Sequence, residues 1–368
     1  MLAGALAQKP RHGGHAWVLL QYLLGFKRLG WDVLFLDRLL PSVADPPNEF
    51  LEIMYRFGLE NQFALLRDDS SETVGLSRTA VVEKVRDSAV FLNVMGFISD
   101  PEVLGRAERR VFLDIDPGFP QMWTMLGLYD SFTAHNAFVT IAANVGQADC
   151  AIPTCGRDWI TTVQPVVLAR WPTSPSPKAA AFTSVVTWRG ANGPVEYEGK
   201  TYGLRVHEFR AFAELPRITA GEFELALDIH PSEIGDLKLL RRGGWWLVDP
   251  VRAAGDPCAY QTYIQRSAAE FMVAKNMYVA TRSGWFSDRS ICYLASGKPV
   301  LIQDTGLAGH YPVGAGLLTF SSLEGARDGV KHIIENYSTH ASQARRIAEQ
   351  YFDSDRVLTR LLSNLGVM

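Results

Sequence analysis

Short apolar runs alternate along most of the chain with longer segments that have helical spacing. Runs of four to seven residues rich in Val, Ile, Leu and Phe are typical of strands buried on both faces of a parallel sheet. Strands and helices in regular alternation predict doubly wound parallel sheets, an α/β fold. The expected strands are residues 33–36, 89–94, 110–115, 138–142, 182–188, 223–229, 245–248, 277–281, 299–303 and 317–320.

The alternation is interrupted near the middle of the chain. Residues 171–181 read WPTSPSPKAAA, with three prolines in seven residues from Pro172. Such Pro- and Ser-rich composition is typical of a linker. We therefore predict two Rossmann-like domains that face each other across a cleft, residues 1–172 and residues 181–345.

The second half contains the stretch with the clearest chemical signal, residues 277–306. Its pattern predicts a strand at its start, preceded by a helix at residues 260–275. A Ser-Gly turn, a helix capped by Ser287 and ended by Gly297, and a further strand are predicted to follow. The N-terminus of such a helix presents free N–H groups and a positive dipole, which suit a diphosphate. Asp304 follows the second strand, at the sheet edge where α/β proteins bind ligands. A purely structural turn is the alternative, since every doubly wound domain contains such units.

Two segments of this stretch, 281–287 and Ala295-Ser296-Gly297-Lys298-Pro299-Val300, resemble the donor-binding region of nucleotide-sugar-dependent glycosyltransferases with the GT-B fold. In that family a Gly-Trp-x-Ser turn holds the phosphates of the sugar nucleotide. Arg282 stands here in place of the family's His, and Ser290 or Cys292 near the place of its ribose-binding Glu. The resemblance, with the helix and strand ends, implies donor contacts for Arg189, Arg282, Ser283, Gly284, Trp285, Phe286, Ser287, Asp288, Arg289 and Asp304.

The same resemblance assigns the acceptor to the first domain. Gly13 and Gly14 occupy its first strand–helix loop, where we expect them to bind the sugar nucleotide by letting a phosphate or sugar approach the backbone. His15 falls where some of these enzymes place a base, and Asp116 follows a strand end before a Pro-Gly turn. In the alternative interpretation His15 caps its helix and Asp116 caps its turn. The fold also implies that residues 346–368 form a helix returning towards the first domain.

The reaction implied is transfer of a sugar from a nucleotide-diphosphate sugar to an acceptor hydroxyl. The helix start at residues 287–289, with Arg189 and Arg282, would stabilise the leaving diphosphate without a metal. A metal pair at Asp114 and Asp116 is the less favoured alternative, and no cofactor is expected beyond the donor. Two other functions stay open: a sugar-nucleotide epimerase of the same fold, and a non-catalytic nucleotide-binding partner protein.

Composition narrows the function classes further. The 368 residues suffice for two domains, and 47% hydrophobic with 20% charged residues is typical of a globular protein. A formal net charge of −3 provides no basic field for nucleic acid. No apolar run approaches the ~18 residues of a membrane span. The start lacks the features of a signal peptide, and four cysteines without metal spacing fit a reducing compartment, so we expect a cytoplasmic protein.

Overall fold

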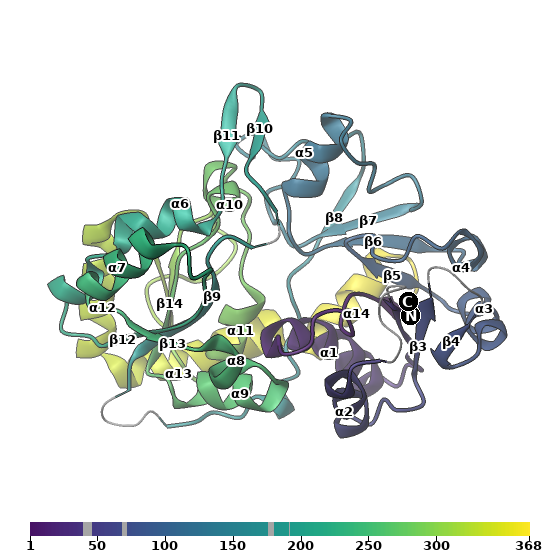
Figure 1. Ribbon diagram of the computed structural model, residues 1–368, viewed down its shortest axis with the longest axis horizontal. Coiled ribbons are helices and arrows are strands. Elements are labelled where there is room, and N and C mark those ends of the chain that lie inside the picture. Colours follow the sequence, from purple (N-terminus) through teal and green to yellow (C-terminus); the bar gives the residue numbers. More distant parts are fainter. Residues whose placement is uncertain (40–45, 68–71, 176–179, 191) are drawn as a thin grey trace.

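The computed structural model describes residues 1–39, 46–67, 72–175, 180–190 and 192–368, and it contains two β-sheets side by side, surrounded by helices (Figure 1). The first sheet has the strand order β4-β3-β2-β1-β5-β6-β7-β8. Only its edge pair β3–β4 is antiparallel. Its strands are β1 (Leu2–Ala3), β2 (Phe35–Leu39), β3 (Phe63–Arg67), β4 (Thr73–Gly75), β5 (Phe91–Val94), β6 (Arg110–Asp114), β7 (Ala137–Thr140) and β8 (Trp159–Thr161).

The second sheet is parallel and has the order β13-β12-β9-β14-β15-β16. This is the 3-2-1-4-5-6 order of a Rossmann fold, whose ligand site lies where the order reverses, here between β9 and β14. Its strands are β9 (Phe182–Thr187), β12 (Phe223–Asp228), β13 (Trp246–Val248), β14 (Ala269–Met272), β15 (Val300–Gln303) and β16 (Leu317–Phe320), and a separate antiparallel hairpin is formed by β10 (Val195–Tyr197) and β11 (Lys200–Tyr202).

Helices connect the parallel strands. The first half contains α1 (Gly13–Arg28), α2 (Asn48–Arg56), α3 (Arg78–Arg86), α4 (Pro101–Arg106) and α5 (Phe119–Met125). The second half and the C-terminal region contain α6 (Arg205–Phe209), α7 (Ile234–Gly243), α8 (Pro250–Ala254), α9 (Pro257–Arg266), α10 (Asn276–Ala280), α11 (Asp288–Ala295), α12 (Leu323–Glu335), α13 (Tyr337–Ile347), a π-helical turn η4 (Ala348–Phe352) and α14 (Ser354–Asn364).

The predicted fold class, two doubly wound α/β sheets, is confirmed, but β3, β4 and β8 were not predicted and one strand was misplaced. Residues predicted as the strand 277–281 form α10, and the strand is β14, inside the segment 260–275 predicted as a single helix. Glu270 interrupts the apolar run of β14, although its side chain is fully buried. Short apolar runs suit a buried strand and a buried helix equally, so the pattern could not separate the two. The domain limits stay a prediction, and part of the expected linker, residues 176–179, lies outside the described residues.

The C-terminal helix α14 packs against α1 of the first half (Figure 1). Arg28 and Asp355 form an ion pair between them, with a 2.9 Å distance between nitrogen and oxygen. Gly25 makes the close approach possible, because a Cβ there would lie 2.5 Å from Cδ1 of Leu358. Leu358 is fully buried in this contact. The first half is therefore completed by residues from the end of the chain.

This contact predicts a compensating pair of substitutions. Leu358→Ala is expected to lower the free energy of unfolding by about 2–5 kcal/mol through lost burial and a cavity. Gly25→Ala alone is expected to cost about 1–3 kcal/mol, because its methyl group collides with Leu358. In the double variant the new methyl group enters the cavity, so the combined loss should be smaller than the sum. Urea unfolding of the four proteins measures it, and strict additivity would contradict the packing described.

Candidate functional site

Asp116, just beyond β6, joins the two halves at the carboxyl ends of their strands. Its carboxylate accepts hydrogen bonds from Nζ of Lys275 at 2.6 and 2.8 Å and from the hydroxyl of Tyr278. Nδ2 of Asn192 lies 3.5 Å away. Lys275 and Tyr278 belong to the segment after β14, so the contact spans both sheets. The turn-capping alternative for Asp116 does not describe these contacts, since its partners come from the other half.

Arg205, at the start of α6, occupies the point where the strand order of the second sheet reverses. Its Nε donates to the carbonyl oxygen of Val273 at 2.9 Å, and its Nη1 to that of Thr187 at 3.2 Å. These carbonyls follow or end β14 and β9, the two strands at the reversal. Burial lowers the pKa of Arg205 to about 10, so the guanidinium stays charged at neutral pH. Asp116 and Tyr278 are among the charged or titratable groups that act on it.

Lys9 brings a third cation from the loop after β1. The Lys9 side chain is exposed, yet desolvation by the surrounding protein lowers its pKa. The negative charge of Asp116 raises this pKa, and the positive charge of Lys275 lowers it. The charges of both members of the Asp116–Lys275 pair therefore act on Lys9. Lys275 thus contacts the carboxylate of Asp116, and the charge of Asp116 also acts on Lys9 and on Arg205. Three cations under the influence of one carboxylate can bind an anion of more than one charge.

His15, predicted as a base, lies on the first turn of α1. Its Nε2 is 2.6 Å from the carbonyl oxygen of Ala5, which can only accept, so Nε2 carries the proton and Nδ1 a free lone pair. Burial, followed by the charge of Lys9, lowers the pKa of His15 to about 3. No hydrogen bond joins His15 to Asp116 among the described residues. An imidazole with so low a pKa is neutral at pH 7 and binds a proton weakly, which limits it as a base.

The lowered pKa of His15 predicts an acid-sensitive contribution to stability. The unfolded imidazole takes up its proton below pH 6.5 and the folded one only near pH 3, so stability is present above 6.5 and is lost as pH falls. Between pH 7 and pH 5 the loss is expected to be about 1–2 kcal/mol. His15→Gln, which keeps a donor for Ala5, should lose less over this range, measured by urea unfolding. Asp37 and Asp114, whose pKa values are raised to about 7 by burial, titrate in both proteins and cancel in the difference.

The space beside Gly13 and Gly14, where a ligand was predicted to approach, is filled by other residues of the protein. A Cβ on Gly13 would collide with the backbone of residues 254–256, and one on Gly14 would lie 2.8 Å from the ring of Tyr260. Gly118, before α5, is similarly close to the sulfur of Met277. Gly13 thus contacts the backbone of the second half, and Gly14 and Gly118 contact its side chains. Their requirement for a small residue comes from packing between the halves.

The predicted phosphate turn also contacts the first half. Nδ2 of Asn144 donates to the carbonyl oxygens of Arg282 and Gly306, at 2.8 and 2.9 Å, and its backbone N–H to that of Ser283. Gly284 has a positive φ of 68° and donates its N–H to Thr305 at 2.7 Å. The Arg282 side chain pairs with Asp149 at 3.2 Å. In this structure the turn is therefore part of the contact between the halves.

The helix that follows the turn is capped as predicted. Ser287 accepts from the N–H of Arg289 at 3.2 Å, and Gly297 with a φ of 71° follows the helix end. Arg289 pairs with the buried carboxylate of Glu270 at 2.7 Å and donates to the carbonyl oxygen of Val185. One nitrogen of Arg289 and one oxygen of Glu270 are buried without a hydrogen-bond partner. Burial raises the pKa of Glu270.

The remaining predicted residues lie apart from Asp116. Arg189 is bound to Glu233 at the start of α7. Asp304 accepts from the N–H groups of Gly306 and Leu307, both at 3.0 Å, as a turn cap. Trp285 stacks on Tyr278 with ring centroids 4.3 Å apart, and Phe286 stacks on Phe352. Trp285 therefore supports the tyrosine that binds Asp116.

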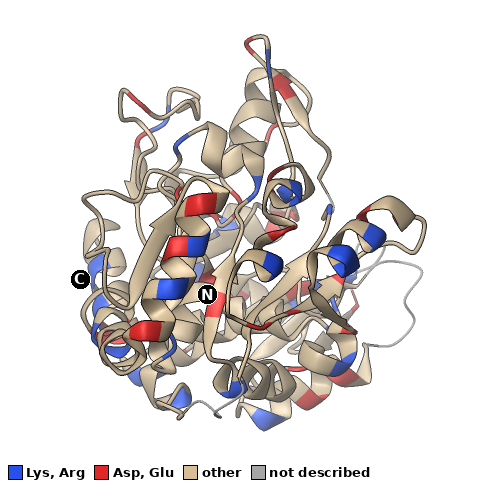
Figure 2. Ribbon diagram, turned by 90° about the vertical axis from the view of Figure 1, so that its left-hand side faces the viewer, with Lys and Arg blue, Asp and Glu red and all other residues tan. Residues whose placement is uncertain are grey.

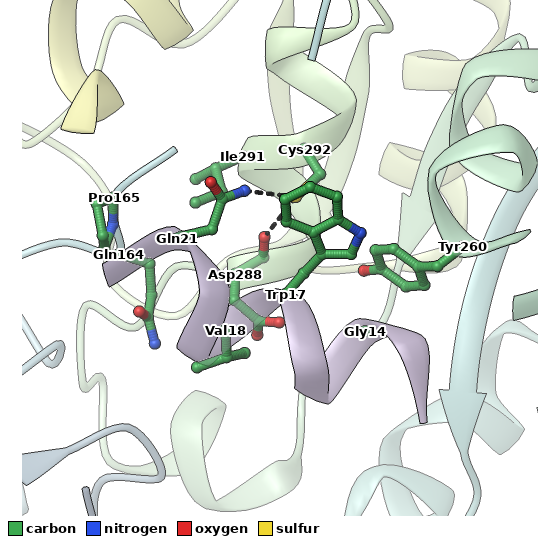
Figure 3. A pocket seen from close by; sticks show the side chains of 10 residues that line it. All are labelled: Gly14, Trp17, Val18, Gln21, Gln164, Pro165, Tyr260, Asp288, Ile291 and Cys292. Carbon is green, nitrogen blue, oxygen red and sulfur yellow. Dashed lines mark hydrogen bonds between the residues drawn. The ribbon is translucent and has the colours of Figure 1, made fainter. Parts of the chain in front are cut away.

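A small cavity lies between the halves, where α1 meets α9 and α11 (Figure 3). Asp288 lines it, beside Trp17 and Tyr260, and the amide of Gln21 lies 3.8 Å from the sulfur of Cys292. Its volume of about 10 Å³ is at the lower limit for one water molecule. Burial raises the pKa of Asp288. Gly14 and Asp288, both predicted to bind the sugar nucleotide, line this cavity.

Sequence reasoning missed Arg205, Lys9 and Tyr278 as members of the site. Lys275 was not among the predicted site residues, because the supposed strand 277–281 placed it before a strand when it follows one. With β14 recognised, a basic residue just after a central strand would have identified it. Arg205 carries no local signal, since its position depends on two strands that lie far apart in sequence.

The described residues form neither a membrane-spanning helix nor a cluster of metal ligands. Within the described ranges, every helix is too short or too polar to cross a membrane. In the same part of the chain, no three His, Cys, Asp or Glu side chains are grouped as metal ligands. Acidic and basic residues are interspersed on the side of the molecule formed by the second half (Figure 2).

No protein-family model matches the chain. No curated protein matches it in sequence. Solved structures do match it in three dimensions. HepE from Anabaena in complex with UDP-glucose has a TM-score of 0.62 at 12% identity, covering 100% of this chain and 99% of that one.

Two other structures show the same likeness. An alpha-glucosyltransferase in complex with UDP has a TM-score of 0.60 at 9% identity, covering 99% of this chain and 98% of that one. Sucrose-phosphate synthase from Thermosynechococcus elongatus has a TM-score of 0.57 at 10% identity, with coverage of 99% and 98%. At such identities the likeness concerns the fold. Two facing parallel sheets with this likeness over the whole length mean that the chain has the GT-B fold.

Proposed function

We propose that the protein is a glycosyltransferase that moves a sugar from a nucleotide-diphosphate sugar to an acceptor hydroxyl without a metal ion. The observation that carries the proposal is the contact of Lys275 with Asp116 at the strand ends of both sheets, with the buried Arg205 at the strand reversal and Lys9 both subject to the charge of Asp116. A diphosphate leaving group gains charge as its bond to the sugar breaks. Fixed cations aimed at that charge stabilise the transition state.

Asp116 is the proposed acceptor for the proton of the attacking hydroxyl. The acceptor oxygen forms a bond to the anomeric carbon, the bond from that carbon to the diphosphate breaks, and the acceptor proton passes to the carboxylate. Asp116 would exchange its contact with Lys275 for the acceptor, which frees the ammonium group for the diphosphate. The low pKa of His15 makes it the weaker candidate for this role.

UDP-sugars are the first donors to test, because solved structures of the same fold were determined with UDP or UDP-glucose. Other donor groups assigned from sequence, such as Arg189 and the turn at residues 282–289, stay proposals for the nucleotide. An acceptor on the first half, facing Asp116, completes the proposed arrangement.

The test incubates the protein with a panel of UDP-sugars and acceptors and measures both nucleotide release and the sugar nucleotide that remains. A transferase releases UDP in proportion to acceptor and continues to do so in excess chelator. Conversion of the sugar nucleotide without acceptor would assign an epimerase. Binding of UDP by calorimetry with no conversion of any donor would assign a non-catalytic partner. Loss of turnover in chelator, restored by a divalent cation, would contradict metal independence.

A further inference from the structure

Four large apolar side chains project from the end of α5 and the turn that follows it. Their exposed fractions are 52% for Met125, 43% for Leu126, 69% for Leu128 and 57% for Tyr129. We call these four residues the α5 patch. Single exposed apolar residues are common, but four within five positions are not explained by packing.

The turn presents this patch in a fixed geometry. Gly127 has a φ of 67°, its N–H donates to the carbonyl oxygen of Thr124, and that of Leu128 to Trp123. This is a Schellman motif, in which the residue at the position of Leu128 usually folds back on the helix. Here Leu128 points into solvent, although the hydroxyl of Thr124 also holds the turn, 3.2 Å from the carbonyl oxygen of Tyr129.

The α5 patch lies at the far end of the helix that begins beside the proposed site. α5 begins three residues after Asp116, and its seven residues extend for about 10 Å. The helix lies beside the hairpin β10–β11 of the second half, over the junction of the two sheets (Figure 1). A molecule whose hydroxyl lies at Asp116 would therefore need an extension of about 10 Å to reach the α5 patch.

The charges nearby indicate what kind of molecule this is. Residues 111–156 contain no Lys or Arg, and the charge of Arg157 acts on Asp130, next to the α5 patch. A phosphate-bearing lipid surface or a nucleic acid is held by a cluster of cations, which one arginine does not provide. The neighbouring hairpin adds Glu196, Glu198 and Lys200, with acidic groups in excess. An uncharged apolar group is the occupant that such a surface favours.

We infer that the acceptor of this protein carries an uncharged alkyl or aromatic portion, which binds the α5 patch while its hydroxyl lies at Asp116. The inference rests on the proposed function for the identity of the site. It adds the class of acceptor: an amphiphilic alcohol or glycoside, as opposed to a purely polar sugar.

The test measures binding of n-hexyl, n-heptyl and n-octyl β-D-glucosides below their micelle concentrations, by calorimetry with UDP present. Affinity is expected to rise about two- to threefold per added methylene, somewhat less than for complete burial. In Leu128→Ser/Tyr129→Ser the dependence on chain length should disappear. The matched control is Ile234→Ser/Trp246→Ser, whose side chains are exposed to the same 57% and 69% but lie in the second half, and it should keep the dependence. Leu128→Ser alone serves if the double variant folds poorly.

Equal affinity for all three glucosides, or an unchanged dependence in the patch variant, would overturn the inference. Binding to phosphatidylcholine vesicles that the patch variant loses would assign the α5 patch to a membrane, and a dimer that it abolishes would assign it to a second copy. The melting temperature with and without UDP tests the proposed function separately from the inference about the acceptor. If UDP does not stabilise the protein but affinity still depends on chain length, the proposed function is wrong, and binding of alkyl groups to the α5 patch is still supported.

Discussion

Replacing Arg205 with alanine is expected to lower kcat/KM for the nucleotide-sugar donor by about 10²- to 10³-fold, the loss typical of one preorganised group at a developing charge. The guanidinium is held by carbonyl groups at the ends of β9 and β14, so little reorganisation is needed when the diphosphate leaves. Arg205→Lys retains a charge but only one of the two directed contacts, and should be intermediate. Steady-state kinetics with a UDP-sugar measures these effects.

The control for Arg205 lies five residues further on. Arg210 pairs with Asp236 at 2.9 Å, and its partners are on α7, away from Asp116. Arg210→Ala should therefore change the melting temperature more than kcat/KM. Because Arg205 also supports two strand ends, its variants are compared per folded fraction. Normal turnover of folded Arg205→Ala would remove the residue from the site.

Asp116→Asn is expected to lower kcat by about 10²- to 10⁴-fold while the affinity for UDP changes little. The amide keeps the shape of the side chain and its contact with Tyr278, but it cannot take the proton of the acceptor. Asp116→Glu keeps the carboxylate and should retain more activity than the amide. His15→Gln should lose less than Asp116→Asn, since an imidazole with a pKa near 3 contributes little as a base.

The contrary result for Asp116 would be informative as well. The carboxylate joins the two halves through Lys275, so its loss could act on their association alone. In that case Lys275→Met would reproduce the kinetics of Asp116→Asn, and small-angle scattering would show both variants expanded. Unchanged dimensions with a specific loss in kcat support the role in proton transfer.

Structural features that depend only on residues close together in the chain could be predicted from the sequence. Ser287 caps α11, and Gly297 follows its end, because a cap depends only on the adjacent turn. The alternation of strands and helices likewise determines the fold class. β14 was missed because Glu270, a carboxylate in the middle of a central strand, is tolerated only through its partner Arg289, nineteen residues away.

The candidate site was harder to predict, since it depends on contacts between the halves. Asp116 and His15 were identified as residues at strand and helix ends, but their partners were not. Lys275 and Tyr278 reach Asp116 from a distant segment, and Gly13 is small because the backbone of residues 254–256 lies against it. Rules of spacing apply within one element and do not contain this information.

The pairing of α1 with α14 has a consequence for synthesis of the protein on the ribosome. The slot beside Gly25 stays empty while more than three hundred further residues are translated, because Leu358 has not yet been made. Until then the first half exposes an apolar groove, and contacts so distant in sequence form slowly. Residues 1–172 produced alone should therefore aggregate, and a synthetic peptide of residues 348–368 should rescue them. The nascent first half would depend on chaperones until the last helix closes it.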